Sequence, residues 1–173
     1  MFMRRSTILV TAAWLSLLSS HALGYDTLIR VTGSVRVNSC VVAADSINLN
    51  VPMGTVQASD LYAPDSQRPQ TPFVLNLENC GVAFSGAKIR FTAQKDENDP
   101  TLIRIDPSGA TGVGIQLLDE EGNRLAVGEQ TAAKGRAGDD RVAINFFARL
   151  AATGAPLKAG PVSASVVWNV EYQ

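Results

Sequence analysis

The sequence predicts an all-β protein, and three observations lead to that fold class. Apolar and polar residues alternate in several segments, as they do in strands with one buried face. Clusters of Gly, Pro, Asn and Asp separate these segments, as in turns. After residue 24, no window of about eleven or more residues has the apolar spacing of an amphipathic helix. Short strands separated by turns favour a β-sandwich.

The first 24 residues have the pattern of a secretory signal peptide. Arg4 and Arg5 precede the apolar run STILVTAAWLSLL, which is too short to span a bilayer. Small residues follow, and cleavage after either Gly24 or Ala22 fits them; the alternative is a retained amphipathic anchor. Without residues 1–24, the 173-residue chain keeps 173 − 24 = 149 residues, which is the size of one domain.

The expected strands follow one another along the rest of the chain. They are residues 25–37, 45–51, 71–80, 87–94, 112–127, 141–150 and 161–173. Residues 112–127 read as a hairpin, because Gly122 and Asn123 can supply the positive φ of a tight turn. Residues 52–71 and 94–112 are expected to be long loops, the second with a short strand in its TLIRI segment.

The composition excludes several classes of function. The single histidine, His21, lies in the signal peptide, so the mature chain has no histidine base for nucleophilic catalysis. Removing Arg4 and Arg5 leaves 15 − 2 = 13 basic against 16 acidic residues, a net charge of −3 with no signature of nucleic-acid binding. We find no Gly-rich loop that could hold a phosphate. The chain is therefore expected to be no enzyme, with no cofactor and no small-molecule substrate.

The acidic residues are expected to be solvated. Asp119, Glu120, Glu121, Asp139 and Asp140 all lie beside turn residues.

The DENDP segment resembles a calcium loop only faintly. It has Thr101 where such a loop needs glycine and Pro107 where it needs a bidentate glutamate. A polar turn is the better interpretation, and no metal site is predicted.

Two cysteines remain, Cys40 and Cys80, and export to an oxidising compartment favours a disulfide between them over two free thiols. Without histidine, two thiols cannot complete a zinc site. Closing a loop of about 40 residues would stabilise the fold by roughly 4 kcal/mol.

The two ends of the mature chain both alternate. Near the start, Thr27, Ile29, Val31 and Val35 share one face, and this segment could be the first strand of its own sandwich. At the other end the apolar face consists of Val162, Ala164, Val166, Trp168, Val170 and Tyr172. Trp168 could stack on a sugar, but its phase with the apolar face favours the core.

Four segments, in this order, resemble the fimbrial (pilus) subunits of the chaperone-usher family. They are RVTGSVRVNSC, with Gly33 before the first cysteine; LNLENC, which ends at the second cysteine; GIQLLDEEGNRL; and FFARLAATGAPLKAGPVSASVVWNVEYQ. The last is the most specific, because Gly160 is fourteenth from the end and Tyr172 is penultimate, as in the C-terminal signature of that family. The resemblance extends over essentially the whole mature chain.

The resemblance implies an immunoglobulin-like sandwich that lacks its final strand, formed by residues 38–173, with a groove open along its edge. In that family a periplasmic chaperone first lends a strand to the groove, and the N-terminal extension of another subunit then replaces it at the outer-membrane usher. Residues 25–37 would be this extension, with Thr27, Ile29, Val31 and Val35 entering the neighbour's groove and Gly33 fitting where it narrows.

The same resemblance assigns roles to the C-terminus. Gly160 and the apolar face from Val162 to Tyr172 would form the last strand, which pairs with the donated strand, and basic groups of the chaperone would hold the Gln173 carboxylate.

The predicted function is a structural pilin, exported through the periplasm to a fimbrium that supports adhesion on the surface of a Gram-negative bacterium. Its partners would be neighbouring subunits, the chaperone and the usher, with no nucleic acid. The sequence does not distinguish a major shaft subunit from a minor adaptor or terminator. An alternative of another class is a self-contained secreted β-sandwich that binds carbohydrate or protein, with residues 25–37 as its own first strand.

Overall fold

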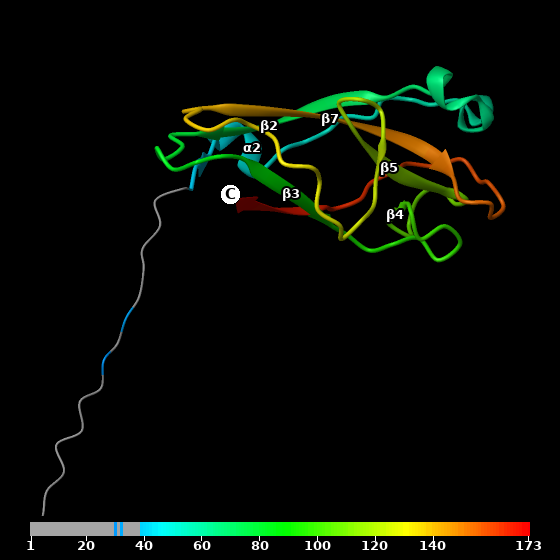
Figure 1. The fold of residues 1–173 in the computed structure, drawn as a ribbon. Coiled ribbons are helices and arrows are strands. Elements are labelled where there is room, and N and C mark those ends of the chain that lie inside the picture. Colours follow the sequence, from blue (N-terminus) through cyan, green and yellow to red (C-terminus); the bar gives the residue numbers. More distant parts are fainter. Residues whose placement is uncertain (1–29, 31, 33–38) are drawn as a thin grey trace, which may run out of the picture. The chain divides into compact units, whose positions relative to one another are not determined.

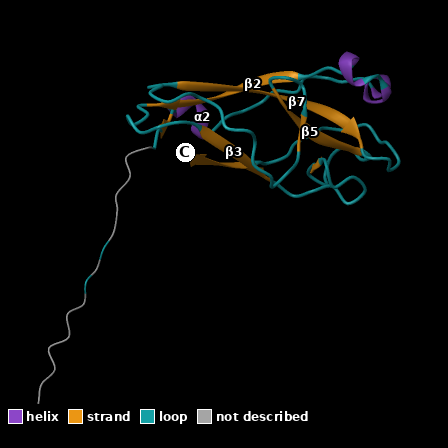
Figure 2. Cartoon of the chain, viewed as in Figure 1, coloured by secondary structure: helices purple, strands orange, loops and turns teal. Residues whose placement is uncertain are grey.

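The computed structural model describes residues 30, 32 and 39–173, and this part of the chain is almost entirely strand and loop (Figures 1 and 2). The strands are β1 (Val41–Val42), β2 (Thr71–Glu78), β3 (Ala87–Thr92), β4 (Ile103–Arg104), β5 (Val113–Asp119), β6 (Arg124–Leu125), β7 (Val142–Ala152) and β8 (Val167–Tyr172). The helices are short: α2 (Ala44–Ile47), η2 (Ala58–Tyr62) and η3 (Asp65–Gln67). No helix among these residues is long and apolar enough to cross a membrane.

Two antiparallel sheets make up the described domain. The larger has the order β1-β2-β7-β5-β4, with β6 added to β5, and the smaller consists of β3 and β8. Figure 1 shows β3 beside the C-terminal strand β8, across from β2 and β7. β2, β3, β7 and the β5–β6 hairpin confirm four of the predicted strand segments, and β4 confirms the short strand expected within TLIRI.

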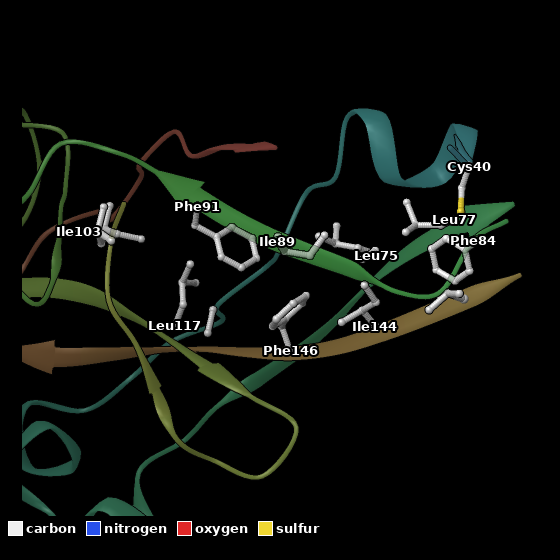
Figure 3. Packing of buried hydrophobic residues seen from close by; sticks show 14 residues of the cluster. Cys40, Leu75, Leu77, Phe84, Ile89, Phe91, Ile103, Leu117, Ile144 and Phe146 are labelled. Atoms are coloured by element: carbon white, nitrogen blue, oxygen red, sulfur yellow. The ribbon is translucent and has the colours of Figure 1, made fainter. Parts of the chain in front are cut away.

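The core lies between the two sheets and takes one face of each central strand. Figure 3 shows Ile89 and Phe91 directed from β3 toward Phe146 of β7. The Phe146 ring is 5.0 Å from that of Phe91 in an edge-to-face contact and 5.5 Å from that of Phe73 in a stacked one. Such pairs stabilise a core by roughly 0.5–1.5 kcal/mol beyond the area they bury. The alternation seen in the sequence thus decides which residues meet in the core.

The predicted disulfide between Cys40 and Cys80 is confirmed, and it links residues that are 40 positions apart. It lies next to the pairing of β1 with β2, where Val41 faces Glu78. The crosslink therefore fixes the beginning of the described domain to the end of a central strand.

The prediction of a strand over residues 45–51 is wrong. Residues 44–47 form the short helix α2, in which the amide of Ser46 donates to the carbonyl of Ala43 (2.9 Å). Ser46 is fully buried, and its hydroxyl accepts a hydrogen bond from the amide of Asn76 on β2 (2.9 Å). The strand prediction assumed that the polar residues of this segment are exposed. Ser46 is instead buried, because its hydroxyl bonds the amide of a distant strand.

The predicted last strand begins later than expected. Residues 161–173 alternate throughout, yet β8 covers only Val167–Tyr172. The described residues provide no ladder partner for residues 164–166. The predicted signal peptide (1–24) and nearly all of the predicted extension (25–37) lie outside the described residues.

Candidate functional site

A groove of about 430 Å³ opens along one edge of the sandwich, between residues 47–53 and residues 162–168. Apolar side chains from both sheets form its floor. They are Phe73, Leu75, Phe91, Ile115, Leu117 and Ala148. On the walls, Ile47 and Leu49 are exposed hydrophobic residues. An apolar depression that reaches into the core between two chain segments is a typical surface for binding another chain.

The backbone along both walls has unused hydrogen-bonding groups. Within the described structure, residues 49–53, which follow helix α2 and its C-cap Asn48, make no backbone hydrogen bond, and neither do residues 164–166. The groove itself separates these two segments, so they cannot pair with each other. Backbone N–H and C=O groups nearly always find partners in native proteins. A single extended chain in the groove could pair with both walls.

Alternate side chains of residues 161–173 turn inward, and those of Val162, Ala164, Val166 and Trp168 line the groove. The residues of the predicted apolar face are each half-buried, while those between them are exposed; the apolar set is Val162, Ala164, Val166, Trp168, Val170 and Tyr172. β8 pairs with β3, from Ala87 opposite Tyr172 to Thr92 opposite Val167. Among the residues that the structure describes, the other edge of β8 has no strand beside it.

Gly160 lies at the start of this wall, in close contact with the loop before β5. A Cβ atom at Gly160 would lie 2.8 Å from the backbone nitrogen of Ala110 and 2.9 Å from the carbonyl carbon of Gly109. The Ala110 amide donates to the Pro161 carbonyl (2.9 Å), and this bond requires the two chains to approach closely. Glycine is therefore needed here for space.

The far end of the wall is held at the disulfide. The Tyr172 hydroxyl donates to the carbonyl oxygen of Cys40 (2.9 Å), and partial burial raises the pKa of the Tyr172 phenol. The Gln173 amide donates to the carbonyl of Gly86 (2.8 Å), and the Gln173 carbonyl accepts from Ser85 (2.9 Å). The last strand is thus fixed at both ends, so the groove is preformed.

Trp168 lies in the wall of the groove. It pairs in register with Phe91 and packs against the main core cluster while still lining the groove. Trp168 is half-buried and both of its neighbours are exposed, so it belongs to the apolar face predicted from the sequence.

The acidic side chains are engaged in turns and surface ion pairs. The Asp119 carboxylate accepts from the amides of Glu121 (3.0 Å) and Asn123 (2.7 Å) in the β5–β6 turn. The Glu120 carboxylate pairs with the Lys134 ammonium, which lowers the pKa of Glu120 and raises that of Lys134. In the DENDP segment, Asp96 accepts from two amides of its own turn. No metal-binding cluster of acidic, cysteine or histidine side chains occurs in the described residues.

The sequence predicts an alternating segment over residues 45–51 but does not identify it as the second wall of the groove. Residues 47–53 lie opposite the last strand, and Leu49, Val51 and Met53 all line the groove. These three positions alternate with Asn50 and Pro52, so the pattern that predicted the strand continues to Met53. The predicted donor residues Thr27, Ile29, Val31, Gly33 and Val35 lie outside the described residues.

The fold and the groove together define an immunoglobulin-like pilin sandwich with an apolar groove open along one edge. The chain matches the family described as "Fimbrial protein" over residues 29–173 and belongs to that family. It is accordingly a structural subunit of a chaperone-usher fimbrium, exported to the surface of a Gram-negative bacterium.

Individual relatives agree with this assignment. The chain is 35% identical over 154 residues to the S-fimbrial protein subunit SfaG of Escherichia coli O6:K15:H31, covering 88% of this chain and 87% of the relative. The solved antigen and type I fimbria protein of Burkholderia pseudomallei is 31% identical, with a TM-score of 0.60 over 78% of this chain and 89% of that one. The P pilus rod subunit PapA, at 21% identity and a TM-score of 0.63 over 78% of this chain and 99% of its own, shares the fold.

Proposed function

We propose that this subunit polymerises by donor-strand exchange, in which residues 25–37 of one copy or of another subunit fill the groove of the next. The observation that carries this proposal is the groove with unpaired backbone on both walls, residues 49–53 and 164–166. A strand that pairs with both walls would satisfy these backbone groups and cover the apolar floor.

The alternation of residues 25–37 supports their role as the donor. Thr27, Ile29, Val31 and Val35 fall on one face of an extended chain, and Gly33 falls in phase with them. Burying three aliphatic side chains would contribute roughly 5–9 kcal/mol before the entropy cost of binding. Head-to-tail contacts of this kind do not close on themselves, so they build a fibre.

The roles of the remaining segments follow from the same mechanism. Residues 1–24 direct export and are removed, and residues 38–173 form the pilin domain. The wall from Gly160 to Tyr172 pairs first with a strand of the periplasmic chaperone, whose basic groups hold the Gln173 carboxylate, and then with the incoming subunit at the usher. The protein has a structural and not a catalytic role, which is consistent with acidic side chains that lie in turns and ion pairs.

A peptide-binding experiment tests the groove. The subunit of residues 38–173, which lacks its own donor segment, is refolded with a peptide of residues 25–37, and the fluorescence of Trp168 is followed. Trp168 is then the single tryptophan, because the other of the two in the chain is Trp14. We expect a saturable blue shift, since an inserted strand would exclude water from the indole.

Two peptide variants provide a matched comparison. Ile29→Asp places a charge on the face expected to enter the groove, whereas Arg30→Asp places the same charge on the opposite face. We expect the first to abolish the shift and the second to preserve it. Equal effects of the two variants, or a subunit that is stable and monodisperse with no donor, would instead support a self-contained sandwich.

A further inference from the structure

A buried pair of polar side chains lies on the face of the larger sheet opposite the groove. Gln116 of β5 and Arg149 of β7 stand directly opposite each other in the sheet register. Their neighbours Ile115, Leu117 and Ala148 line the groove. Because successive side chains of a strand point to opposite faces, Gln116 and Arg149 face away from the groove. Both are almost fully buried, at 2% and 3% exposure.

Arg149 connects this face to the loop that carries η3. Its Nε and Nη2 atoms donate to the Gln116 Oε1 atom (3.0 and 2.7 Å). Its Nη1 atom donates to the Asp65 backbone carbonyl (3.0 Å), and its Nη2 atom also donates to the Asp65 carboxylate (2.9 Å). Arg149 is therefore fixed in place and its charge is held close to the sheet.

The Asp65 carboxylate is shared by three guanidinium groups. Arg124 donates to its Oδ2 atom (2.9 Å), and Arg68 lies 3.3 Å from its Oδ1 atom, in addition to the contact with Arg149. Hydrogen bonds from Arg124 and Arg149 lower the pKa of Asp65 to about 2, so this carboxyl is ionised at neutral pH. Three positive charges against one negative leave an excess of two positive charges, in a chain with a net charge of −1.

A pocket of about 230 Å³ opens beside this cluster, with Arg149, Arg68 and Asp65 in its lining. Ser66 and Gln70 also line it, and in the described part of the chain their side chains have no hydrogen-bond partner. The Nη2 group of Arg68 and the Nη1 group of Arg124 likewise have no acceptor among the described residues. The cluster therefore combines excess positive charge with unused hydrogen-bond donors.

We propose that this pocket binds a small oxyanion, either a free phosphate or sulfate ion or the carboxylate of an acidic sugar. Guanidinium groups bind such anions through charge-assisted and often bidentate hydrogen bonds. The volume is below the 300–1,000 Å³ or so that is usual for drug-sized ligands, which suits one oxyanion group and not a large molecule. Because the pocket and the groove lie on opposite faces of β5 and β7, a strand in the groove leaves the pocket open.

Titration calorimetry on the subunit with residues 25–37 fused after Gln173 tests this proposal. The probes are inorganic phosphate, D-glucuronate and, as a neutral control, D-glucose, each at matched ionic strength. We expect saturable binding of phosphate and none of glucose. Binding of glucuronate as well would extend the site to acidic sugars, whereas phosphate binding alone would identify a free inorganic anion as the ligand. No saturable binding of either anion would overturn the proposal.

Variants distinguish a built site from general surface charge. Arg68→Gln should weaken anion binding about tenfold or more, because it removes a charged donor from the lining of the pocket. Arg124→Gln should weaken it as well, because Arg124 contributes positive charge beside the pocket through its contact with Asp65. Arg104→Gln is the control, since Arg104 is a half-exposed arginine that pairs with Glu97 and neither lines the pocket nor contacts Asp65. Near-ultraviolet circular dichroism verifies that each variant is folded. If Arg104→Gln weakened binding as much as the other two variants, the site would not exist.

Discussion

Replacing Asp65 by asparagine should destabilise the subunit by about 1–2 kcal/mol. The change keeps the shape of the side chain but removes the carboxylate that faces Arg149, whose side chain is only 4% exposed. Removing one partner of a fully buried ion pair typically costs about 3–5 kcal/mol. The cost is smaller here because the Asp65 side chain is 49% exposed, and because Arg149 keeps its bonds to Gln116 and to the backbone of residue 65.

The pKa shift of Asp65 gives a second figure for the free energy that its carboxylate contributes to the fold. The pKa of Asp65 falls from 3.8 to about 2, which corresponds to roughly 2 kcal/mol before solvent screening and about 1 kcal/mol after it. A lowered pKa stabilises the fold above the unfolded value of 3.8, and this contribution is lost as the pH falls toward 2. The advantage of the wild type over Asp65→Asn should therefore be constant near neutral pH and shrink within that window.

Urea denaturation of the donor-fused subunit, at a series of pH values, measures this difference. Arg124→Gln serves as a control for the exposed part of the cluster, and its cost should stay below about 1 kcal/mol because surface ion pairs contribute little. Our reasoning would be refuted by an Asp65→Asn variant as stable as the wild type at neutral pH. A difference that did not diminish between pH 3.8 and about 2 would refute it equally.

Three further substitutions test the frame of the groove, each by urea denaturation of the same donor-fused subunit. Gly160→Ala places a methyl group 2.8 Å from the Ala110 nitrogen and should cost about 1–3 kcal/mol; an unchanged midpoint would contradict the close approach. Tyr172→Phe removes the 2.9 Å hydrogen bond to the Cys40 carbonyl and should cost about 1 kcal/mol, and a cost near zero would mean that the bond contributes nothing. Cys80→Ser removes the disulfide and should cost about 2–5 kcal/mol, and reduction of the wild-type disulfide with a thiol should cost the same. If both measurements fell below this range, the disulfide would not stabilise the fold.

The strands that cross the core could be predicted from the sequence because burial enforces alternation. In β2, β3 and β7, one face packs in the core and the other is more exposed, so period-two patterning is visible without a structure. The disulfide was predictable for another reason, since two cysteines in an exported chain have few other uses.

Other features depend on contacts between distant segments and leave little trace in the sequence. The helix α2 forms where Ser46 caps the amide of Asn76, 30 residues away. Arg149 and Gln116 occupy positions that read as ordinary outward-facing strand residues, and only the loop around Asp65 buries them. The alternation of residues 45–51 is visible in the sequence, but their place in the groove is not, because it depends on the last strand more than 100 residues away.

Backbone amide hydrogen exchange measures strand addition at both walls of the groove. The refolded subunit of residues 38–173, which lacks the signal peptide and its own donor segment, is compared with and without the peptide of residues 25–37. We predict that the amides of residues 49–51, residue 53 and residues 164–166, which have no backbone partner in the described structure, exchange rapidly alone and become protected on both walls when the peptide is present. Amides that are already protected without the peptide, or that stay unprotected on either wall with it, would contradict strand addition in this groove.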